Sequence, residues 1–373
     1  MTRGVMGAAD YIESLELMGM QFGLDRMHAL MDALGHPEEQ FDAIHVVGSN
    51  GKSSTVWFCE ALLESEGVHS GAYTSPHLTT FRERIRLGGA TISPELYEAA
   101  VGAVQGTGLE LTQFEALTGA AFVAFAEADV GMAVVEAGLG GRLDATNVLA
   151  RSMVQVLTNV SLEHAELLGP TREAIAREKL AVVPPGGHVI AGEPGWEGLV
   201  PQADWVKVVS VGGSYQDQNR AVARAAVEAA LGRPVDPAAI EELGVPGRLE
   251  VRGTRPLEIW DGAHNPAGMQ RLVSELPAMI GDRQSVAVFS ALADKDVAAM
   301  VSLLRTVCPT VVATTSSNSR ALPADAVASL AGGPAAESPH EALDAARVLA
   351  GPTGAVVVCG SLYLLHDLAS ASG

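Results

Sequence analysis

A short glycine-containing loop carries the residues best suited to hold a phosphate group. It reads Gly48-Ser-Asn-Gly-Lys-Ser-Ser54 and lies between the apolar run 44–47 and a helical pattern at about 52–66. Glycines allow a tight turn in which successive N–H groups point at one anion, and the start of a helix adds partial positive charge. Lys52 supplies an ammonium group, and a following hydroxyl can reach a metal ion. The predicted nucleotide residues of the loop are Asn50, Gly51, Lys52, Ser53 and Ser54.

The loop is shorter than the strict Walker pattern GxxxxGK[ST]. That pattern would require glycine where the chain has Val46. The alternative is that the glycines only turn a strand into a helix. Packing gives no reason for a lysine and two hydroxyls directly after Gly51, so we interpret the loop as a GxxGKS nucleotide site.

The surrounding sequence alternates apolar runs with helical patterns, which is typical of parallel sheets covered on both faces. Helices are predicted near 52–66, 217–231, 267–280 and 297–305. Strands are predicted at 44–47, 132–136, 154–158, 188–191, 257–261, 285–289, 310–314 and 355–358. A Gly/Pro-rich stretch at 243–248 separates two α/β domains, which we place at 1–245 and 246–373.

Composition narrows the function classes. The chain has 373 residues and a net charge of −20, from 44 acidic and 24 basic residues. This excess repels nucleic acids and anionic membranes, so neither is expected as a partner. Three scattered cysteines suit a reducing compartment and are interpreted as core residues. No apolar run approaches the length of a membrane helix, and the first ten residues lack a signal-peptide core. We expect a cytoplasmic protein.

Later segments resemble, in order, the folylpolyglutamate synthase/dihydrofolate synthase family, a branch of the Mur ligase superfamily. The longest match is Glu136-Ala-Gly-Leu-Gly-Gly-Arg-Leu-Asp-Ala-Thr-Asn147. The shorter matches are Thr74-Ser-Pro-His-Leu78, Glu83-Arg-Ile-Arg86, Gln113-Phe-Glu115, Leu162-Glu-His164, Arg177-Glu-Lys179, Pro246-Gly-Arg248 and Asp261-Gly-Ala-His-Asn-Pro266. Each motif alone is weak, whereas the ordered set is highly specific. The resemblance implies an α/β fold with a Mur-ligase-like P-loop ATPase domain, its sheet mostly parallel, and a smaller C-terminal Rossmann-like domain of the glutamate ligase type.

The same resemblance implies an ATP-dependent ligase that joins L-glutamate to a folate or dihydropteroate carboxylate. The γ-phosphate of ATP would pass to the carboxylate, and the amine of glutamate would then displace phosphate from the acyl phosphate. A transfer between anions needs charge neutralisation and positioning. The expected cofactors are ATP and Mg²⁺, the expected partners are these small molecules, and a monomer is expected.

By resemblance, Mg²⁺ is held by Ser75, Glu136 and His164. Glu136 ends an apolar strand, where a carboxylate points toward the carboxyl edge of the sheet. Magnesium prefers oxygen ligands, so His164 is chemically the least expected of the three. His164 is also compatible with a hydrogen-bonded loop histidine, and Ser75 with a turn or cap residue.

Three residues are expected to be catalytic by resemblance: Lys52, Lys179 and His264. Lys179 lies near the end of a predicted helix. It is compatible with a solvated lysine stabilised by the helix dipole, whereas the resemblance implies that it can be carbamylated and help to organise the metals. Arg248, Asp261 and His264 resemble nucleotide-contacting residues, although Asp261 or Asn265 is also compatible with a helix N-cap ahead of Pro266. Asn219 is a weaker candidate for adenine contact.

The expected folate contacts are Arg82, Phe114, Asp144, Ala145 and Asn147. The ring of Phe114 could stack on a pterin, although a single phenylalanine is as often a core residue. Arg82 could pair with the negative charge of a glutamate tail or be a solvated surface residue.

Some positions depart from the family pattern. Ser53 stands where folate ligases usually have glycine, Glu163 replaces an aspartate, and Tyr215 replaces a histidine. The segment 192–210 is shorter than usual, which predicts the loss of an edge strand pair. The loop therefore supports membership of the Mur ligase superfamily but leaves the substrate open. The folate substrate is supported by residues 136–147. Two alternatives stay open: a Mur-type ligase with another acceptor, and a nucleotide-binding regulator without turnover.

Overall fold

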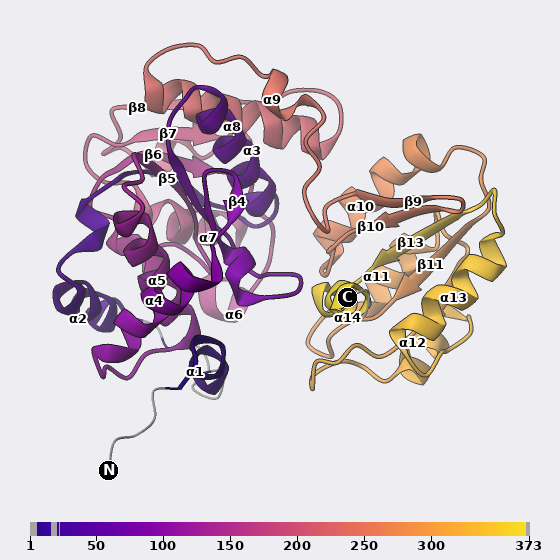
Figure 1. The fold of residues 1–373 in the computed structure, drawn as a ribbon. Helices are drawn as coiled ribbons and strands as arrows, with labels where there is room; N and C mark the ends of the chain where they lie inside the picture. The colour runs from indigo at the N-terminus through magenta and orange to yellow at the C-terminus, as the bar shows by residue number, and fades with distance from the viewer. Residues whose placement is uncertain (1–5, 16–20, 22, 371–373) are drawn as a thin grey trace. The chain divides into compact units, whose positions relative to one another are not determined.

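The computed structural model describes residues 6–15, 21 and 23–370. It divides into two compact units, Met1–Leu243 and Gly244–Gly373 (Figure 1). The sequence placed this division two residues later, after residue 245. Residues 1–5, on which part of the signal-peptide expectation depends, lie outside the described residues.

Unit 1 is built on an eight-stranded sheet with the order β4-β3-β2-β5-β1-β6-β7-β8. The strands are β1 (Asp42–Val47), β2 (Ser70–Tyr73), β3 (Ile85–Leu87), β4 (Ala90–Thr91), β5 (Met132–Glu136), β6 (Ser152–Leu157), β7 (His188–Ala191) and β8 (Trp205–Val208). The six strands from β2 to β8 in this order are parallel, and β3 and β4 form an antiparallel edge. The central strands are continuous apolar runs because helices cover both of their faces.

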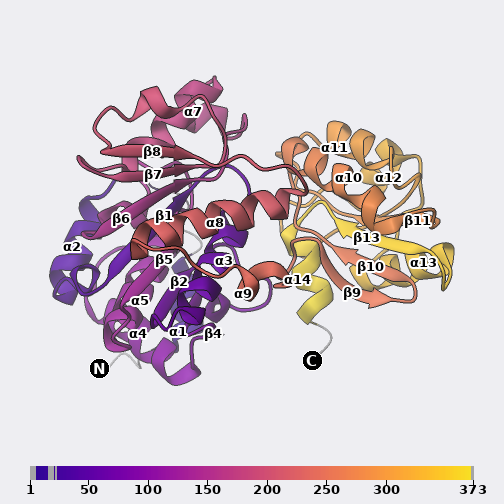
Figure 2. The same ribbon diagram turned by 90° about the horizontal axis from the view of Figure 1, so that it is seen from above.

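The helices of unit 1 lie on both faces of this sheet (Figures 1 and 2). Helices α3 and α8 pack together on one face. On the other face, α4 and α5 build a core with β2 and β5, and α7 packs under β1, β6 and β7. The bounds are α1 (Ala8–Ser14), α2 (Asp25–Leu34), α3 (Lys52–Ser65), α4 (Pro94–Gly106), α5 (Gln113–Glu127), α6 (Ala165–Leu168), α7 (Arg172–Lys179), α8 (Tyr215–Leu231) and α9 (Ala238–Glu241). Short 3-10 turns are η2 (Pro37–Glu39), η3 (Phe81–Arg84), η4 (Ala145–Val148), η5 (Leu180–Val182) and η6 (Glu197–Leu199).

Local sequence explains where several of these helices begin. Thr112 accepts a hydrogen bond from the N–H of Glu115 at the start of α5, and the Glu115 side chain caps in return. Ser214 and Asp217 form the same capping box at the start of α8. These caps satisfy N–H groups that the helix itself leaves without a partner.

Unit 2 has a five-stranded sheet with the order β12-β11-β13-β10-β9, in which only β9 is antiparallel to its neighbour. Helices α10, α11 and α12 pack on one face, and α13 and α14 on the other. The strands are β9 (Glu250–Thr254), β10 (Leu257–Trp260), β11 (Ser285–Phe289), β12 (Thr310–Ala313) and β13 (Ala355–Cys359). The helices are α10 (Pro266–Ile280), α11 (Val297–Leu304), α12 (Ala324–Ala331), α13 (Pro339–Ala350) and α14 (Leu362–Ser370).

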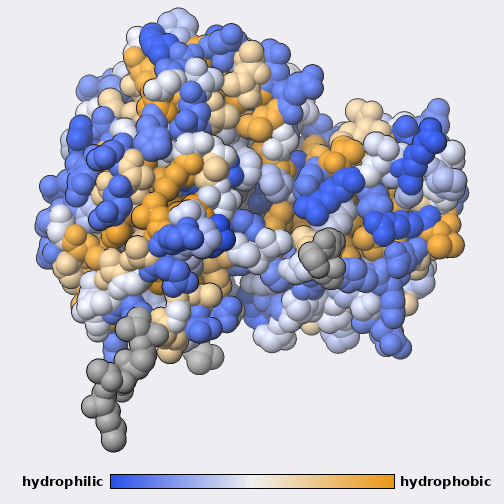
Figure 3. All heavy atoms as spheres, viewed as in Figure 1, coloured by the Kyte–Doolittle hydropathy of each residue, from blue (hydrophilic) through white to orange (hydrophobic). Residues whose placement is uncertain are grey.

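The surface and the core agree with the composition. On the face in Figure 3, apolar areas are small and interspersed with hydrophilic side chains on both units. The three cysteines are buried and unpaired, and burial raises the pKa of each thiol. They are core residues, as the sequence predicted. Within the described residues, no helix combines the length and apolar character needed to cross a membrane.

Candidate active site

Three neighbouring strands of unit 1 bring the predicted phosphate and metal residues to one edge. Strand β1 lies between β5 and β6, and all three are parallel. The phosphate loop follows β1, Glu136 is the last residue of β5, and Thr158 follows β6. Because parallel strands end at the same edge of a sheet, these positions lie together where α/β proteins bind ligands.

Two glycines of the loop are required by their surroundings. Gly48 and Gly51 have φ values of 145° and 86°, in the region that favours glycine. A Cβ atom at Gly48 would lie 1.9 Å from the Thr158 hydroxyl, and one at Gly51 would lie 2.5 Å from Oδ1 of Asn219. The predicted adenine residue Asn219 therefore lies against the phosphate loop.

The loop is fastened to the segment after β6. The N–H of Ser49 donates to the carbonyl of Asn159 at 2.9 Å, and the Thr158 hydroxyl and the Asn159 amide both donate to the carbonyl of Asn50, at 2.8 and 2.6 Å. These bonds fix the backbone that would hold phosphate. Sequence reasoning missed Thr158 and Asn159. The predicted strand 154–158 ends one residue earlier, at Leu157, which frees the Thr158 side chain for the loop.

Two lysine ammonium groups converge on one backbone carbonyl. The Nζ atoms of Lys52 and Lys179 each donate to the carbonyl of Gly48 at 3.0 Å. Lys179 is 2% exposed and also pairs with Glu163 at 3.1 Å. Burial, and then the charge of Lys52, lower the pKa of Lys179 to about 8. Burial opposes ionisation of Glu163, but the nearby lysines outweigh it, so the pKa of this carboxyl is lowered. The solvated-lysine alternative for Lys179 is excluded.

The predicted metal residues Ser75 and Glu136 meet at the same edge, together with Ser53. The Ser53 hydroxyl donates to Oε1 of Glu136 at 3.2 Å, and the N–H of Ser75 donates to Oε2 at 3.2 Å. Glu136 is 2% exposed. A buried carboxylate with two neighbouring serines is an oxygen donor set that suits Mg²⁺. His164 begins α6 next to Glu163, in a left-handed conformation with φ of 47°.

Two buried polar atoms of the loop test its fit to a nucleotide. The Ser54 hydroxyl and the Nδ2 atom of Asn50 are buried and have no hydrogen-bond partner among the described residues. Such groups are costly unless something binds them. The predicted phosphate residues therefore fit an anion and its metal ion. Within the described part of the chain, the Ser54 hydroxyl and the Asn50 amide have no protein partner that a ligand would have to displace, and both lie close to Lys52 in the sequence.

Most of the predicted folate residues lie on the loop after β5 or against it. The Asp144 carboxylate accepts from the N–H groups of Leu139 and Thr146, and Asn147 Nδ2 donates to the carbonyl of Arg142, so both side chains hold the loop's shape. Burial raises the pKa of Asp144. Phe114 lies over Gly138, whose Cβ would lie 2.6 Å from its ring.

The remaining folate candidates differ in setting. Ala145 is buried at the start of η4. The guanidinium of Arg82 donates twice to the carbonyl of Ile92, at 3.1 and 2.8 Å. Its structural role is visible, and a role toward a glutamate tail stays a prediction.

The predicted nucleotide residues of unit 2 form one cluster from the segments before β9 and after β10. Asp261 accepts from the N–H of Leu249 at 2.9 Å and from that of Ala263 at 2.8 Å. A Cβ atom on Gly262 would lie 2.3 Å from a guanidinium nitrogen of Arg248, so the arginine crosses this glycine. Nδ1 of His264 lies 2.8 Å from the Gly262 carbonyl. The cap of α10 is Asn265, not Asp261.

A cluster of hydroxyl residues at the carboxyl edge of unit 2's sheet escaped sequence reasoning. Ser290 follows β11, Thr314 and Ser316 follow β12, and Ser361 follows β13; all four are buried. The N–H of Ser316 donates to the Ser290 hydroxyl at 3.1 Å, while the hydroxyls of Thr314 and Ser316 are buried and unpaired within the described part of the chain. The available signal was the serine or threonine that follows each of three apolar runs.

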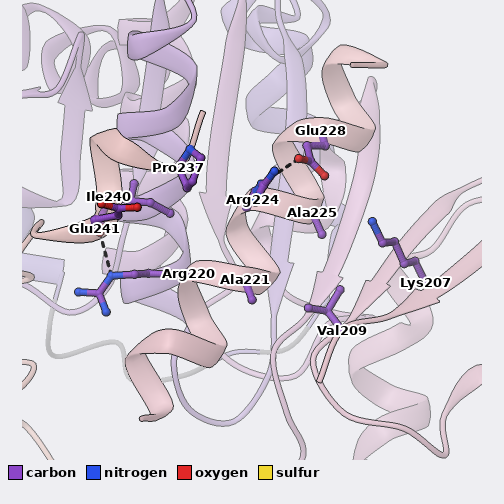
Figure 4. A pocket seen from close by; sticks show the side chains of 10 residues that line it. All are labelled: Lys207, Val209, Arg220, Ala221, Arg224, Ala225, Glu228, Pro237, Ile240 and Glu241. Carbon is purple, nitrogen blue, oxygen red and sulfur yellow. Dashed lines mark hydrogen bonds and ion pairs between the residues drawn. The ribbon is translucent and has the colours of Figure 1, made fainter. Parts of the chain in front are cut away.

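A separate hollow of about 360 Å³ lies between α8, α9 and β8 (Figure 4). Its wall carries the Arg224–Glu228 pair, at 2.9 Å, and Arg220, which donates to the carbonyl of Ile240 at 2.8 Å. None of the residues predicted for nucleotide, metal or folate lines it. We therefore place the candidate active site at the sheet edges and not here.

Comparisons with known proteins agree with this geometry. Residues 46–185 match the middle domain of Mur ligases, and residues 247–362 match the Mur ligase glutamate ligase domain. The dihydrofolate synthase/folylpolyglutamate synthase of Mycobacterium tuberculosis is 33% identical, over 87% of this chain and 82% of that protein. A probable bifunctional folylpolyglutamate synthase/dihydropteroate synthase of Haloferax volcanii is 32% identical over 96% of this chain, which spans about half of that relative, 49%.

Solved structures give the same result. The E. coli FolC in complex with DHPP and ADP has a TM-score of 0.91 and 27% identity, and covers 100% of this chain and 99% of its own. A bifunctional folylpolyglutamate synthase/dihydrofolate synthase with Mn, AMPPNP and L-glutamate bound has a TM-score of 0.89 and 27% identity, with coverage of 99% and 98%. The α/β fold predicted from the sequence is confirmed.

Proposed function

The chain belongs to the folylpolyglutamate synthase/dihydrofolate synthase family, and from that membership we propose that it uses ATP to join L-glutamate to a folate or dihydropteroate carboxylate. The observation that carries the proposal is the joint placement of Lys52, Lys179 and Glu136 at the end of β1 and β5. Two cations and a buried carboxylate beside a glycine loop suit phosphoryl transfer between anions.

In this proposal the loop of unit 1 prepares the carboxylate. The N–H groups after Gly48 and the ammonium of Lys52 bind the phosphates of ATP and offset the charge that develops as the γ-phosphoryl group moves to the acceptor. Ser53, Ser75, Glu136 and His164 would hold Mg²⁺, which when bound neutralises phosphate charge. The glutamate amine then attacks the acyl phosphate carbon, the C–O bond to phosphate breaks, and the amine loses a proton.

The cluster of unit 2 is assigned to the nucleotide and the amino acid. Arg248, Asp261 and His264 are proposed for ATP, on resemblance and on their clustering at Gly262, where the segment before β9 meets the segment after β10. The hydroxyl cluster of Ser290, Thr314, Ser316 and Ser361 is proposed for glutamate. Its support is that two of the buried hydroxyls have no partner among the described residues, and that ligands of parallel sheets bind at this edge.

Lys179 is proposed to exist in part as a carbamate, formed when its neutral amine adds to the carbon of CO₂ and releases a proton. The lowered pKa of about 8 supports the proposal because it makes the neutral amine accessible near neutral pH. The test is Lys179→Ala with and without added bicarbonate. Wild type should be activated by bicarbonate and the variant should not. Unchanged activity in the variant, with no bicarbonate response in either protein, would remove the idea.

The substrate is tested by ADP release that depends on glutamate, measured first with dihydropteroate and then with tetrahydrofolate. Activity with the first, the second or both separates dihydrofolate synthase, folylpolyglutamate synthase and the bifunctional enzyme. ADP release with neither acceptor would contradict the folate assignment and favour another Mur-type ligase. No ADP release under any condition would favour a regulator without turnover.

A further inference from the structure

A histidine and two glutamates lie together at the end of the sheet opposite the active site. His36 and Glu38–Glu39 lie where α2 passes into η2, just before β1. One possible ligand atom from each of the three residues lies within 4.8 Å of the others. The phosphate loop follows the far end of β1, and a six-residue strand spans about 20 Å. This cluster is therefore separate from the candidate active site.

The two ring nitrogens of His36 face different carboxylates. Nε2 lies 3.4 Å from Oδ1 of Asp32, one turn earlier on α2, and Nδ1 lies 3.0 Å from Oε1 of Glu38. In one tautomer Nδ1–H donates to Glu38; in the other, with the proton on Nε2 beside Asp32, the lone pair of Nδ1 points at a carboxylate oxygen. That arrangement is attractive only when a cation lies between them, either a second proton or a metal ion.

Glu38 differs from three other buried glutamates of the chain in having no arginine partner among the described residues. Glu60, Glu115 and Glu258 are each paired with an arginine, at 2.6, 2.8 and 2.7 Å. The Glu38 side chain is only 7% exposed, and its single ion-pair partner among the described residues is His36. Its Oε2 atom is buried and has no hydrogen-bond partner there, as is true of Oε1 of Glu60, but Glu60 has an arginine on its other oxygen. A buried carboxylate oxygen without a partner is costly, so this position is short of positive charge.

We propose that His36, Glu38 and Glu39 form a divalent-metal site that takes Zn²⁺. Nδ1 of His36 and one oxygen from each glutamate are the protein ligands, and Asp32 holds the other ring nitrogen. One imidazole with carboxylates is a donor set that suits zinc, and a carboxylate on the second nitrogen of a metal-bound histidine is a recurrent arrangement. Binding would tie the end of α2 to the turn that leads into β1 and would stabilise unit 1.

The test is the zinc content of the full-length, metal-free chain after equilibrium dialysis against Zn²⁺. Excess Mg²⁺ and ADP are present so that the phosphate loop is occupied. Wild type is expected to retain one zinc ion per chain that His36→Ala and Glu38→Gln lack. His28→Ala removes an exposed histidine from the preceding helix α2 and should bind like wild type. Asp32→Asn should weaken binding by about 10-fold or more.

Thermal unfolding gives an independent result. Zn²⁺ should raise the Tm of wild type and of His28→Ala, and leave that of His36→Ala unchanged, because only a folded-state ligand stabilises. If Glu38→Gln fails to fold, the exposed Glu39→Gln takes its place and should bind zinc at least about 10-fold more weakly. Equal zinc content and affinity in wild type and His36→Ala would overturn the proposal. Because His36 has no assigned part in catalysis, ligase activity should be the same in both proteins.

Discussion

The two units place different chemistry at equivalent edges of their parallel sheets. In unit 1, a buried glutamate ends β5, and Nζ of Lys52 from α3 and Nζ of Lys179 from α7 meet on the Gly48 carbonyl just after β1. In unit 2, the ends of β11, β12 and β13 carry neutral hydroxyls, and the charged residues Asp261 and Arg248 lie after β10 or before β9. A similar fold therefore presents a concentrated charge at one edge and a set of neutral donors at the other.

This difference indicates a division of labour. Charge concentrated in a buried site acts strongly on phosphoryl transfer, where negative charge is shared among several oxygens. Neutral hydroxyls add specificity at little electrostatic cost, and they can donate to carboxylates and accept from an ammonium group, both of which glutamate carries. Changes in unit 1 should therefore alter the rate, and changes to the hydroxyls of unit 2 should alter the apparent affinity for glutamate.

The largest expected effect comes from Lys52→Ala. Loss of this cation should lower kcat for ADP formation by about 10²–10³-fold, the usual cost of removing a charge-stabilising donor. Lys207→Ala, which removes an exposed lysine from β8 in the same unit, is the matched control and should retain full activity. A Lys52→Ala protein with near-normal kcat would contradict the proposal that the charged edge of unit 1 sets the rate.

Lys179→Met tests the electrostatic side of the comparison through stability. The pKa of Lys179 is lowered from 10.5 to about 8 in the folded protein. Between these values the unfolded chain binds more protons, so the Lys179 contribution should rise with pH through this window and be fully unfavourable below it. Denaturant unfolding should show wild type gaining about 3 kcal/mol relative to Lys179→Met between pH 7.5 and 10.5. If the unfolding free energies of the two proteins change in parallel with pH, burial does not lower the pKa of Lys179.

Gly51→Ala tests whether the loop shape is required. The left-handed backbone and the close approach of Asn219 should make alanine unfavourable by about 1–2 kcal/mol, measured as a lower Tm. Gly67→Ala has a similar positive φ but open space around it, and it reports the backbone cost alone. If both variants lose the same stability, Asn219 adds nothing to the requirement.

The smallest expected effect comes from Ser316→Ala in unit 2. The KM for glutamate should rise about 5–10-fold with kcat changed by less than about two-fold, because one neutral hydrogen bond is lost. Stability should be unchanged or slightly higher, since a buried hydroxyl without a described partner is removed. Ser329→Ala, on the exposed face of α12, is the control. A lower kcat with unchanged KM would move Ser316 out of the glutamate site.

Sequence patterns predicted the features that depend on neighbouring residues along the chain, such as buried strands and the residues at their ends. Continuous apolar runs identified β1, β5 and β11 because buried parallel strands need them, and the position of Glu136 at a strand end placed it at the ligand edge. Patterns missed β8, whose exposed and half-buried residues alternate in a short edge strand. They also missed contacts between distant segments. The bond from Lys179 to Gly48 joins residues 131 apart, and no local pattern indicates it.

The sequence also could not predict the role of a side chain that hydrogen-bonds the backbone of its own loop. Asp144 was expected at the folate, and the structure shows its carboxylate holding Leu139 and Thr146 in the loop. The hydroxyl cluster of unit 2 was missed because its members come from three strands and each serine is unremarkable alone. Only the sheet order brings their positions to one edge.

The central claim is that the edge of unit 1 activates the acceptor carboxylate by phosphoryl transfer. It is tested most directly by labelling that carboxylate with ¹⁸O and examining the phosphate released during glutamate addition. If an acyl phosphate forms, one labelled oxygen leaves with inorganic phosphate, and Lys52→Ala slows its appearance in step with product. Inorganic phosphate free of ¹⁸O, with one label kept in the amide and the other lost to water, would contradict the account.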